Sequence, residues 1–244
     1  MGEVLLVTAA AGAGGTGLGG LLALHGFAPG LAVWPGEAAE PAAIPEGRPL
    51  ELLKQRPLLP NGCEAASIAM LLGWAGAPVG MDELFFEHFP RAAFSYMGGD
   101  RFGPDPEEAY AGDASSERGG WYCFEGPAAE GANAFLAAQG SARRARALYG
   151  LDRETLNGYL NAEVPLAVWV TCGYEQPRAS SFSWVLPNGS RYAPYANLHC
   201  VVLAGRQEGG LYRIADPLEG WQAVSPELFW QSFAAMGGRA VVIE

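Results

Sequence analysis

Cys63 opens an apolar segment directly after an Asn61-Gly62 turn, and this placement makes it the first candidate for chemistry. From Cys63 to Trp74 the apolar residues recur at helical spacing, which predicts a helix that begins at the cysteine. The positive end of the helix dipole and the free backbone N–H groups of the first turn stabilise a thiolate and lower its pKa. The same N–H groups suit the oxyanion of an acyl-transfer intermediate. The sequence therefore predicts a nucleophilic cysteine.

A cysteine nucleophile needs a base, and the chain has 3 histidines: His25, His88 and His199. His199 lies in an apolar strand-like run, 198–204, whose alternation lets the imidazole face a cleft while its two neighbours face the other side. Asp216 follows the next predicted strand, so a hairpin would place its carboxylate beside the ring. Gln55, upstream of the cysteine, is a candidate second oxyanion donor.

Each of these residues also has an ordinary structural interpretation. A cysteine at a helix start is often simple packing, a single strand histidine is often a core residue, and Asp before Pro is a common turn signal. Their joint order favours the catalytic interpretation, because the nucleophile opens the first helix and the base and acid lie on consecutive strands.

The predicted elements place helices before strands, which indicates an α+β fold. After an extended lead-in over 50–60, a short helix is expected over 82–87 and an unusually long loop over 95–126, of the kind that usually binds a ligand or is disordered. Turn residues Pro187, Asn188 and Gly189 separate two of the strands. The remaining expected helices are 128–139, 152–162 and 225–236, and the expected strands are 165–171, 181–186, 198–204, 211–215, 221–224 and 239–243.

The N-terminal part differs in composition from the rest. Residues 4–34 contain no Asp, Glu, Lys or Arg and are rich in Ala, Gly and Leu, while 35–49 is rich in Pro, Ala and Glu. Three interpretations of 1–34 remain: a degenerate signal or membrane anchor, a disordered leader, or a structured part of the domain. We expect a linker over 35–49 and the folded domain over 50–244.

Composition excludes several function classes. The formal net charge of -11 argues against nucleic acid as a partner, because phosphate binding needs clustered Lys and Arg. The 4 cysteines show neither zinc-site spacing nor the density of a disulfide scaffold, and at least one of Cys123, Cys172 and Cys200 should be a free buried thiol. We expect no metal and no cofactor, since Gly12 to Gly20 lacks the Lys-Ser/Thr ending of a phosphate loop.

Residues 55–64, Gln-Arg-Pro-Leu-Leu-Pro-Asn-Gly-Cys-Glu, resemble the signature of the peptidase C39-like proteins, which are papain-like relatives of the bacteriocin double-glycine leader peptidases. The resemblance extends over about 50–244. Four later segments carry it: Pro-Asp-Pro-Glu-Glu-Ala-Tyr-Ala-Gly-Asp over 104–113, Pro-Leu-Ala-Val-Trp-Val-Thr over 165–171, His-Cys-Val-Val-Leu-Ala-Gly over 199–205, and Ile-Ala-Asp-Pro-Leu over 214–218.

The resemblance implies a papain-like fold, with an N-terminal helical part packed on an antiparallel β-sheet. It implies a thiol peptidase in which Cys63 is the nucleophile, His199 the base, Asp216 the orienting acid and Gln55 an oxyanion-hole donor. Hydrolysis would pass through an acyl-thioester. Two alternatives stay open: a catalytically inactive binding or surface module, and a cell-wall amidase or acyl transferase of the same fold.

The expected partner is a peptide or protein substrate, and the sequence does not determine the oligomeric state. Aromatic residues of the 95–126 loop either line the substrate path or anchor the loop to the core. The substrate-binding candidates are Asp113, Trp121, Tyr122 and Trp169. Stand-alone proteins of this family are typical of Gram-positive bacteria, and the apolar leader favours an extracellular or cell-surface location, with membrane association through the N-terminal segment. A cytoplasmic location is the alternative.

Overall fold

The computed structural model describes residues 49–244. The predicted leader over 1–34 and the predicted linker over 35–49, apart from Pro49, lie outside the described residues. Within the described part, no helix is long and apolar enough to cross a bilayer.

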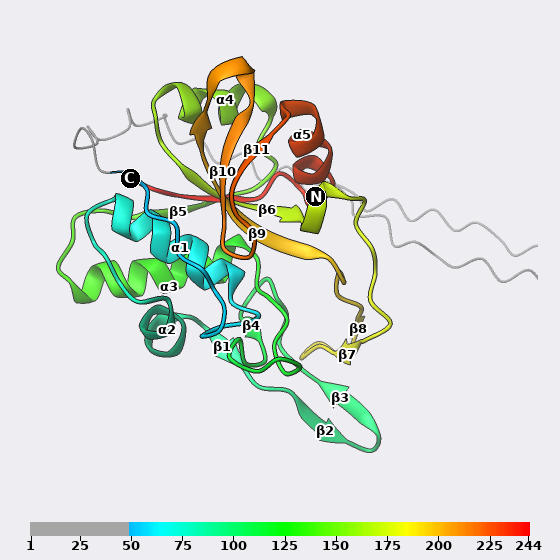
Figure 1. The fold of residues 1–244 in the computed structure, drawn as a ribbon. Helices are drawn as coiled ribbons and strands as arrows, with labels where there is room; N and C mark the ends of the chain where they lie inside the picture. The colour runs from blue at the N-terminus through cyan, green and yellow to red at the C-terminus, as the bar shows by residue number, and fades with distance from the viewer. Residues whose placement is uncertain (1–48) are drawn as a thin grey trace, which may run out of the picture. The chain divides into compact units, whose positions relative to one another are not determined.

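A six-stranded antiparallel sheet forms the centre of the described region (Figure 1). Its strand order is β11-β10-β9-β6-β12-β5, and every neighbouring pair is antiparallel. The long apolar runs of the sequence provide its middle strands, and all six residues of β6 are buried. The strands are β5 (Ala145–Leu148), β6 (Leu166–Thr171), β9 (Leu198–Arg206), β10 (Tyr212–Asp216), β11 (Gly220–Val224) and β12 (Ala240–Ile243).

Helices cover both faces of this sheet, which explains why its central strands are apolar on both sides. Alternate side chains of β6 enter different cores: Ala167 and Trp169 pack with α1 (Cys63–Trp74) and α3 (Glu125–Ala138), whereas Val168 and Val170 pack on the opposite face. That second core contains side chains of α4 (Arg153–Asn161) and α5 (Pro226–Ala235). The predicted mixture of helices and an antiparallel sheet is confirmed.

Local signals define the helix starts. Asp152 caps α4 by accepting a hydrogen bond from the Thr155 N–H at 2.7 Å, as predicted, and Ser225 caps α5 in the same way. Helix α1 has the predicted bounds, and α3 begins three residues earlier than expected. The predicted helix over 82–87 is a single turn, α2 (Met81–Glu83), that continues as a π-helical turn over Leu84–His88.

The predicted long loop over 95–126 is wrong in part, because it contains short strands. β2 (Ser95–Met97) and β3 (Asp100–Phe102) form a hairpin, and β3 pairs with β7 (Trp184–Val185), which pairs with β8 (Arg191–Tyr192). Another two-stranded sheet joins β1 (Arg91–Ala92) to β4 (Tyr110–Ala111). The β3–β7 pairing joins residues about 80 positions apart, which local sequence patterns do not reveal. The β2–β3 hairpin is local, but its residues are mostly exposed and give no apolar alternation.

Trp169 is a core residue, which corrects its prediction as a substrate-binding candidate. Its side chain is fully buried, and the indole N–H donates to the Cys123 carbonyl at 2.9 Å. This bond ties the segment that precedes α3 to the middle of the sheet. No surface of Trp169 is left to contact a substrate.

We expect Trp169→Phe to lower the free energy of unfolding by about 2–4 kcal/mol, because it leaves the buried Cys123 carbonyl without its donor and opens space in the core. Urea denaturation measures the loss. Trp221→Phe is the matched control, since Trp221 is 40% exposed and should lose less than about 1 kcal/mol. Equal losses in the two variants would contradict a core role for Trp169.

Candidate active site

The turn before α1 fixes where Cys63 lies. Gly62 donates its N–H to the Leu59 carbonyl at 2.9 Å, and a Cβ on Gly62 would lie 2.6 Å from the Cβ of Leu59, so the close turn requires glycine. No side chain caps α1, so the N–H groups of its first turn stay available. The predicted placement of Cys63 at a free helix N-terminus is confirmed.

The thiol itself is turned toward its sequence neighbour. Cys63 is 7% exposed, and its Sγ donates a hydrogen bond to Glu64 Oε2 at 3.3 Å. Burial raises the pKa of the thiol well above its ordinary value, and the nearby Glu64 carboxylate raises it further; the backbone of Cys200 acts in the opposite direction. The predicted lowering of this pKa is therefore wrong for the arrangement observed, because burial and a carboxylate outweigh the helix N-terminus.

Glu64 is the site residue that the sequence prediction missed. Its side chain is fully buried, and its Oε1 accepts the backbone N–H of Cys123 at 3.2 Å. Burial raises the pKa of this carboxyl to about 7. The available signal was a single charged residue in the otherwise uncharged segment 63–74.

His199 and Asp216 form a buried pair. The β9–β10 pairing aligns Ala215 with Val202 and brings His199 Nε2 to 2.9 Å from Asp216 Oδ1, so the predicted proximity is confirmed. Oδ1 also accepts the backbone N–H groups of Leu218 at 2.7 Å and Glu219 at 3.1 Å. Because Nε2 donates to the carboxylate, Nδ1 is the ring nitrogen left for other chemistry.

The Asp216 carboxyl is held ionised. Burial alone would raise its pKa, but the hydrogen bond and charge of His199 and the two backbone amides outweigh burial, so the pKa is lowered. Gln222 Nε2 makes a longer contact to Oδ2 at 3.4 Å. An ionised Asp216 fixes the imidazole orientation and stabilises an imidazolium.

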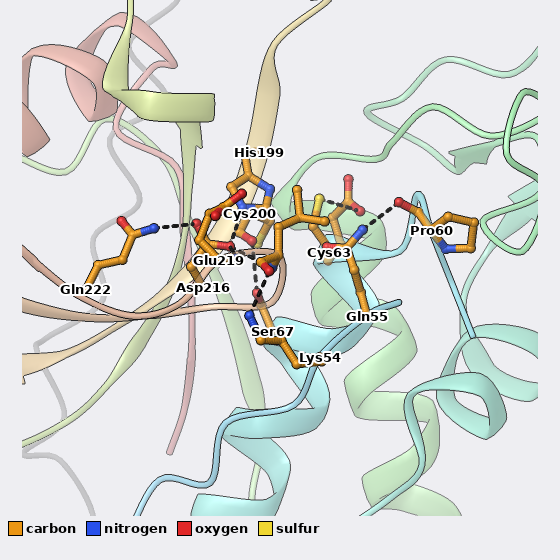
Figure 2. Close-up of polar contacts among 12 residues, drawn as sticks. Lys54, Gln55, Pro60, Cys63, Ser67, His199, Cys200, Asp216, Glu219 and Gln222 are labelled. Carbon is orange, nitrogen blue, oxygen red and sulfur yellow. Dashed lines mark hydrogen bonds and ion pairs between the residues drawn. The ribbon is translucent and has the colours of Figure 1, made fainter. Parts of the chain in front are cut away.

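Cys63 and His199 come close in the fold without forming a hydrogen bond within the described residues. The sulfur lies near the backbone of Cys200, the residue after His199, and Ser67 on α1 donates to the Cys200 carbonyl at 3.1 Å. In the view of Figure 2, the dashed line from the Cys63 sulfur runs away from His199. The structure therefore joins His199 to Asp216, while the Cys63 thiol points elsewhere.

Gln55 connects the segment before Cys63 with the loop that follows Asp216. Its Nε2 donates to the Pro60 carbonyl at 2.7 Å (Figure 2). Its backbone N–H donates to the carbonyl of Pro217, next to Asp216, at 3.0 Å. The side chain is buried, yet Oε1 has no hydrogen-bond partner within the described residues. One hydrogen on Nε2 remains free, because the amide carries two and Pro60 takes one.

The substrate-binding candidates of the 95–126 segment differ in exposure and in whether they line a pocket. Trp121 and Tyr122 line a pocket of about 290 Å³ together with Asn61 and Leu198, the residues near Cys63 and His199 along the chain. Tyr122 is held there by hydrogen bonds to Tyr192 and Tyr195. Asp113 is exposed, does not line this pocket, and accepts hydrogen bonds from the N–H and hydroxyl of Ser115.

The cysteines and acidic residues of the described part show no metal cluster. No group of three His, Cys, Asp or Glu side chains is arranged to hold an ion within residues 49–244. All four cysteines are free thiols, and Cys123 and Cys200 are buried, which confirms the expectation of a free buried thiol.

Comparison with known proteins agrees with this fold. The chain belongs to the Peptidase_C39 like family, which matches residues 49–241. A candidate C39-like peptidase from Bacillus anthracis is 26% identical over 80% of this chain and 94% of its own, with a TM-score of 0.67. The fold is accordingly papain-like, and the family and fold together support a cysteine peptidase.

A second solved structure matches the chain at lower identity and lower structural similarity. A double glycine motif protease from an AMS/PCAT transporter, solved in complex with the leader peptide, is 16% identical over 82% of this chain and 95% of its own, with a TM-score of 0.40. No curated protein matches the chain significantly.

Glu64 should make stability depend on pH. Its folded pKa of about 7 lies above the unfolded value of about 4.3, so the folded state binds the proton more tightly and becomes less stable as pH rises between these values. We expect Glu64→Gln to raise the free energy of unfolding relative to the natural chain by about 1–3 kcal/mol at pH 8 and to change it little at pH 4. Denaturant titrations at the two pH values measure this, and a difference that does not depend on pH would contradict it.

Proposed function

We propose that the chain is a thiol-dependent peptidase in which Cys63 is the nucleophile, His199 the general base and Asp216 the residue that orients the base. The observation that carries the proposal is the buried His199–Asp216 pair. His199, whose Nδ1 is not used in this pair, belongs to β9, and β9 packs against the helix that begins at Cys63. Family membership supports the same reaction class.

The proposed cycle begins when the thiol leaves Glu64 and turns toward His199. Nδ1 takes the thiol proton, and the thiolate attacks the carbonyl carbon of a peptide bond, forming a C–S bond. The imidazolium then gives its proton to the leaving amine as the C–N bond breaks, which leaves an acyl-thioester. Water, deprotonated by Nδ1, attacks the thioester carbonyl, and the departing sulfur regains its proton.

Two donors support stabilisation of the oxyanion. The backbone N–H of Cys63 lies in the uncapped first turn of α1, and Gln55 Nε2 keeps one hydrogen free beside its bond to Pro60. Such preorganised donors act where negative charge develops, and they need no reorganisation during the reaction. In this proposal Pro60 fixes the direction of the Gln55 amide.

The substrate would be an extended peptide that places one side chain in the pocket of Trp121 and Tyr122. Asn61, two residues before Cys63, and Leu198, next to His199, both line this pocket, so in this proposal a bound chain passes close to the nucleophile and the base. Asp113 is exposed and does not line this pocket, so it takes no part in this proposal. The apolar leader and a cell-surface location stay predictions.

A second candidate function is a binding module that does not use its thiol. The raised pKa of Cys63 and the hydrogen bond from its thiol to Glu64 favour it. Transfer of the acyl group to an amine, or cleavage of a cell-wall peptide, shares the acyl-enzyme half of the peptidase cycle and would use the same residues.

Thiol alkylation tests the Cys63–His199 pair. We expect iodoacetamide to modify Cys63 of the full chain at least about tenfold more slowly at pH 7 in His199→Ala than in the natural chain, because the base is removed. Mass spectrometry of each cysteine across pH 5–9 gives the rates, and exposed Cys172 provides an internal control. If Cys63 reacts alike in both proteins, the binding module becomes the better proposal.

The Gln55 role is tested by kinetics. Once a cleaved peptide is found by library screening, we expect Gln55→Ala to lower kcat by about 10²–10³ because an oxyanion donor is lost. Alkylation of Cys63 should change little, since it forms no oxyanion. A parallel loss of alkylation and of kcat would indicate that Gln55 only maintains the fold, and Gln222→Ala is the control for loss of an amide near the site but outside the proposed oxyanion hole.

A further inference from the structure

Glu64 is a buried carboxylate that the proposed cycle does not use. Among residues 49–244 its polar contacts are its own helix start, the Cys63 thiol and the Cys123 N–H, and no ion pair includes it. A buried charge without a cation is costly and is usually paired. Its position beside the nucleophile therefore calls for an explanation.

The charged and titratable groups around Glu64 are all acids. The Glu64 charge raises the pKa of four neighbouring groups. They are Cys63 on the same helix, Cys123 before α3, Cys200 on β9 and Tyr110 on β4. Each of these groups is neutral at pH 7, since burial raises the pKa of every one of them. Glu64 is thus the group most able to carry negative charge in this cluster.

Glu125 shows the ordinary arrangement for comparison. It also lies at a helix start and is 7% exposed, but Arg239 donates to its Oε2 at 2.7 Å. Glu125 is therefore neutralised by a cation, whereas Oε2 of Glu64 accepts its side-chain hydrogen bond from the Cys63 thiol. The contrast assigns Glu64 to the nucleophile rather than to the scaffold.

We propose that Glu64 is a positioning residue that holds the Cys63 thiol in a resting orientation, so that a nucleophile forms only after the thiol leaves Glu64 for His199. The inference rests on the proposed function, because it describes how the same nucleophile is kept inactive. It accounts for the thiol hydrogen bond at 3.3 Å to Oε2 and for the absence, within the described residues, of a bond between Cys63 and His199.

Glu64 acts in two ways in this arrangement. As an acceptor it binds the thiol proton, and as a negative charge it opposes formation of a thiolate beside it. Replacing the carboxylate by an amide removes both effects at little steric change. The amide oxygen can still accept the Cys123 N–H, and the amide N–H₂ then donates to the sulfur, which favours the thiolate.

The test uses the full chain and iodoacetamide as the probe. We expect Glu64→Gln to move the pH midpoint of Cys63 alkylation down by at least about one unit and to raise the rate at pH 7 about tenfold, since one pKa unit is a tenfold change in thiolate at a given pH. Glu64→Ala should move the midpoint in the same direction. Either variant suffices if the other fails to fold, as judged by denaturant titration.

Glu125→Gln is the matched control, because it removes a buried carboxyl at a helix start that does not contact Cys63. We expect its alkylation midpoint to equal that of the natural chain. An unchanged midpoint in folded Glu64→Gln, or an equal shift in Glu125→Gln, would overturn the inference.

His199→Ala separates this inference from the proposed function. If His199→Ala slows alkylation and Glu64→Gln leaves it unchanged, the peptidase proposal stands and the Glu64 role is wrong. If His199→Ala has no effect while Glu64→Gln speeds alkylation, Glu64 restrains the thiol but His199 is not its base.

Discussion

The register of β9 is the constraint on which the site depends. This strand pairs with β6 on one side and β10 on the other, and its residues face different layers on alternate positions. Cys200 enters the core shared with α1, while His199 meets Asp216 from the neighbouring strand. A shift of one residue would exchange these faces and separate His199 from Asp216.

The helix that carries Cys63 is placed by the same strand. Ser67 donates to the backbone of Cys200, and the side chains of Ile68, Leu71 and Leu72 are fully buried in the shared core. The position of Cys63 relative to β9 is therefore set by the packing of α1, whereas its thiol is directed by the hydrogen bond to Glu64. The position of the helix and the direction of the thiol are physically independent, since packing fixes the helix whereas a single side-chain rotation moves the sulfur.

Sequence patterns predicted the long elements well because each carries its own signal. The apolar run 166–171, the helix opened by Cys63 and the Asp152 cap are local features, and the proximity of His199 to Asp216 followed from the expected hairpin. The short strand β5 was not predicted, since its partner β12 is distant in sequence, and the β2–β3 hairpin was not predicted because its residues are mostly exposed and show no apolar alternation. The pKa of Cys63 was mispredicted for a related reason: burial and the direction of the Glu64 side chain depend on tertiary packing.

The hydroxyl of Tyr122 also has a mechanical consequence. It lies 2.9 Å from the Tyr192 hydroxyl and accepts the Tyr195 N–H at 2.8 Å, so one phenol fastens the segment after β8 to the segment before α3. Tyr122 and Tyr195 both line the pocket near Cys63, so these two parts of its wall are bonded to each other as well as packed on the core. Moving Tyr122 and Tyr195 apart to widen the pocket would break the hydrogen bond between them, so opening on this side costs a partly buried polar contact.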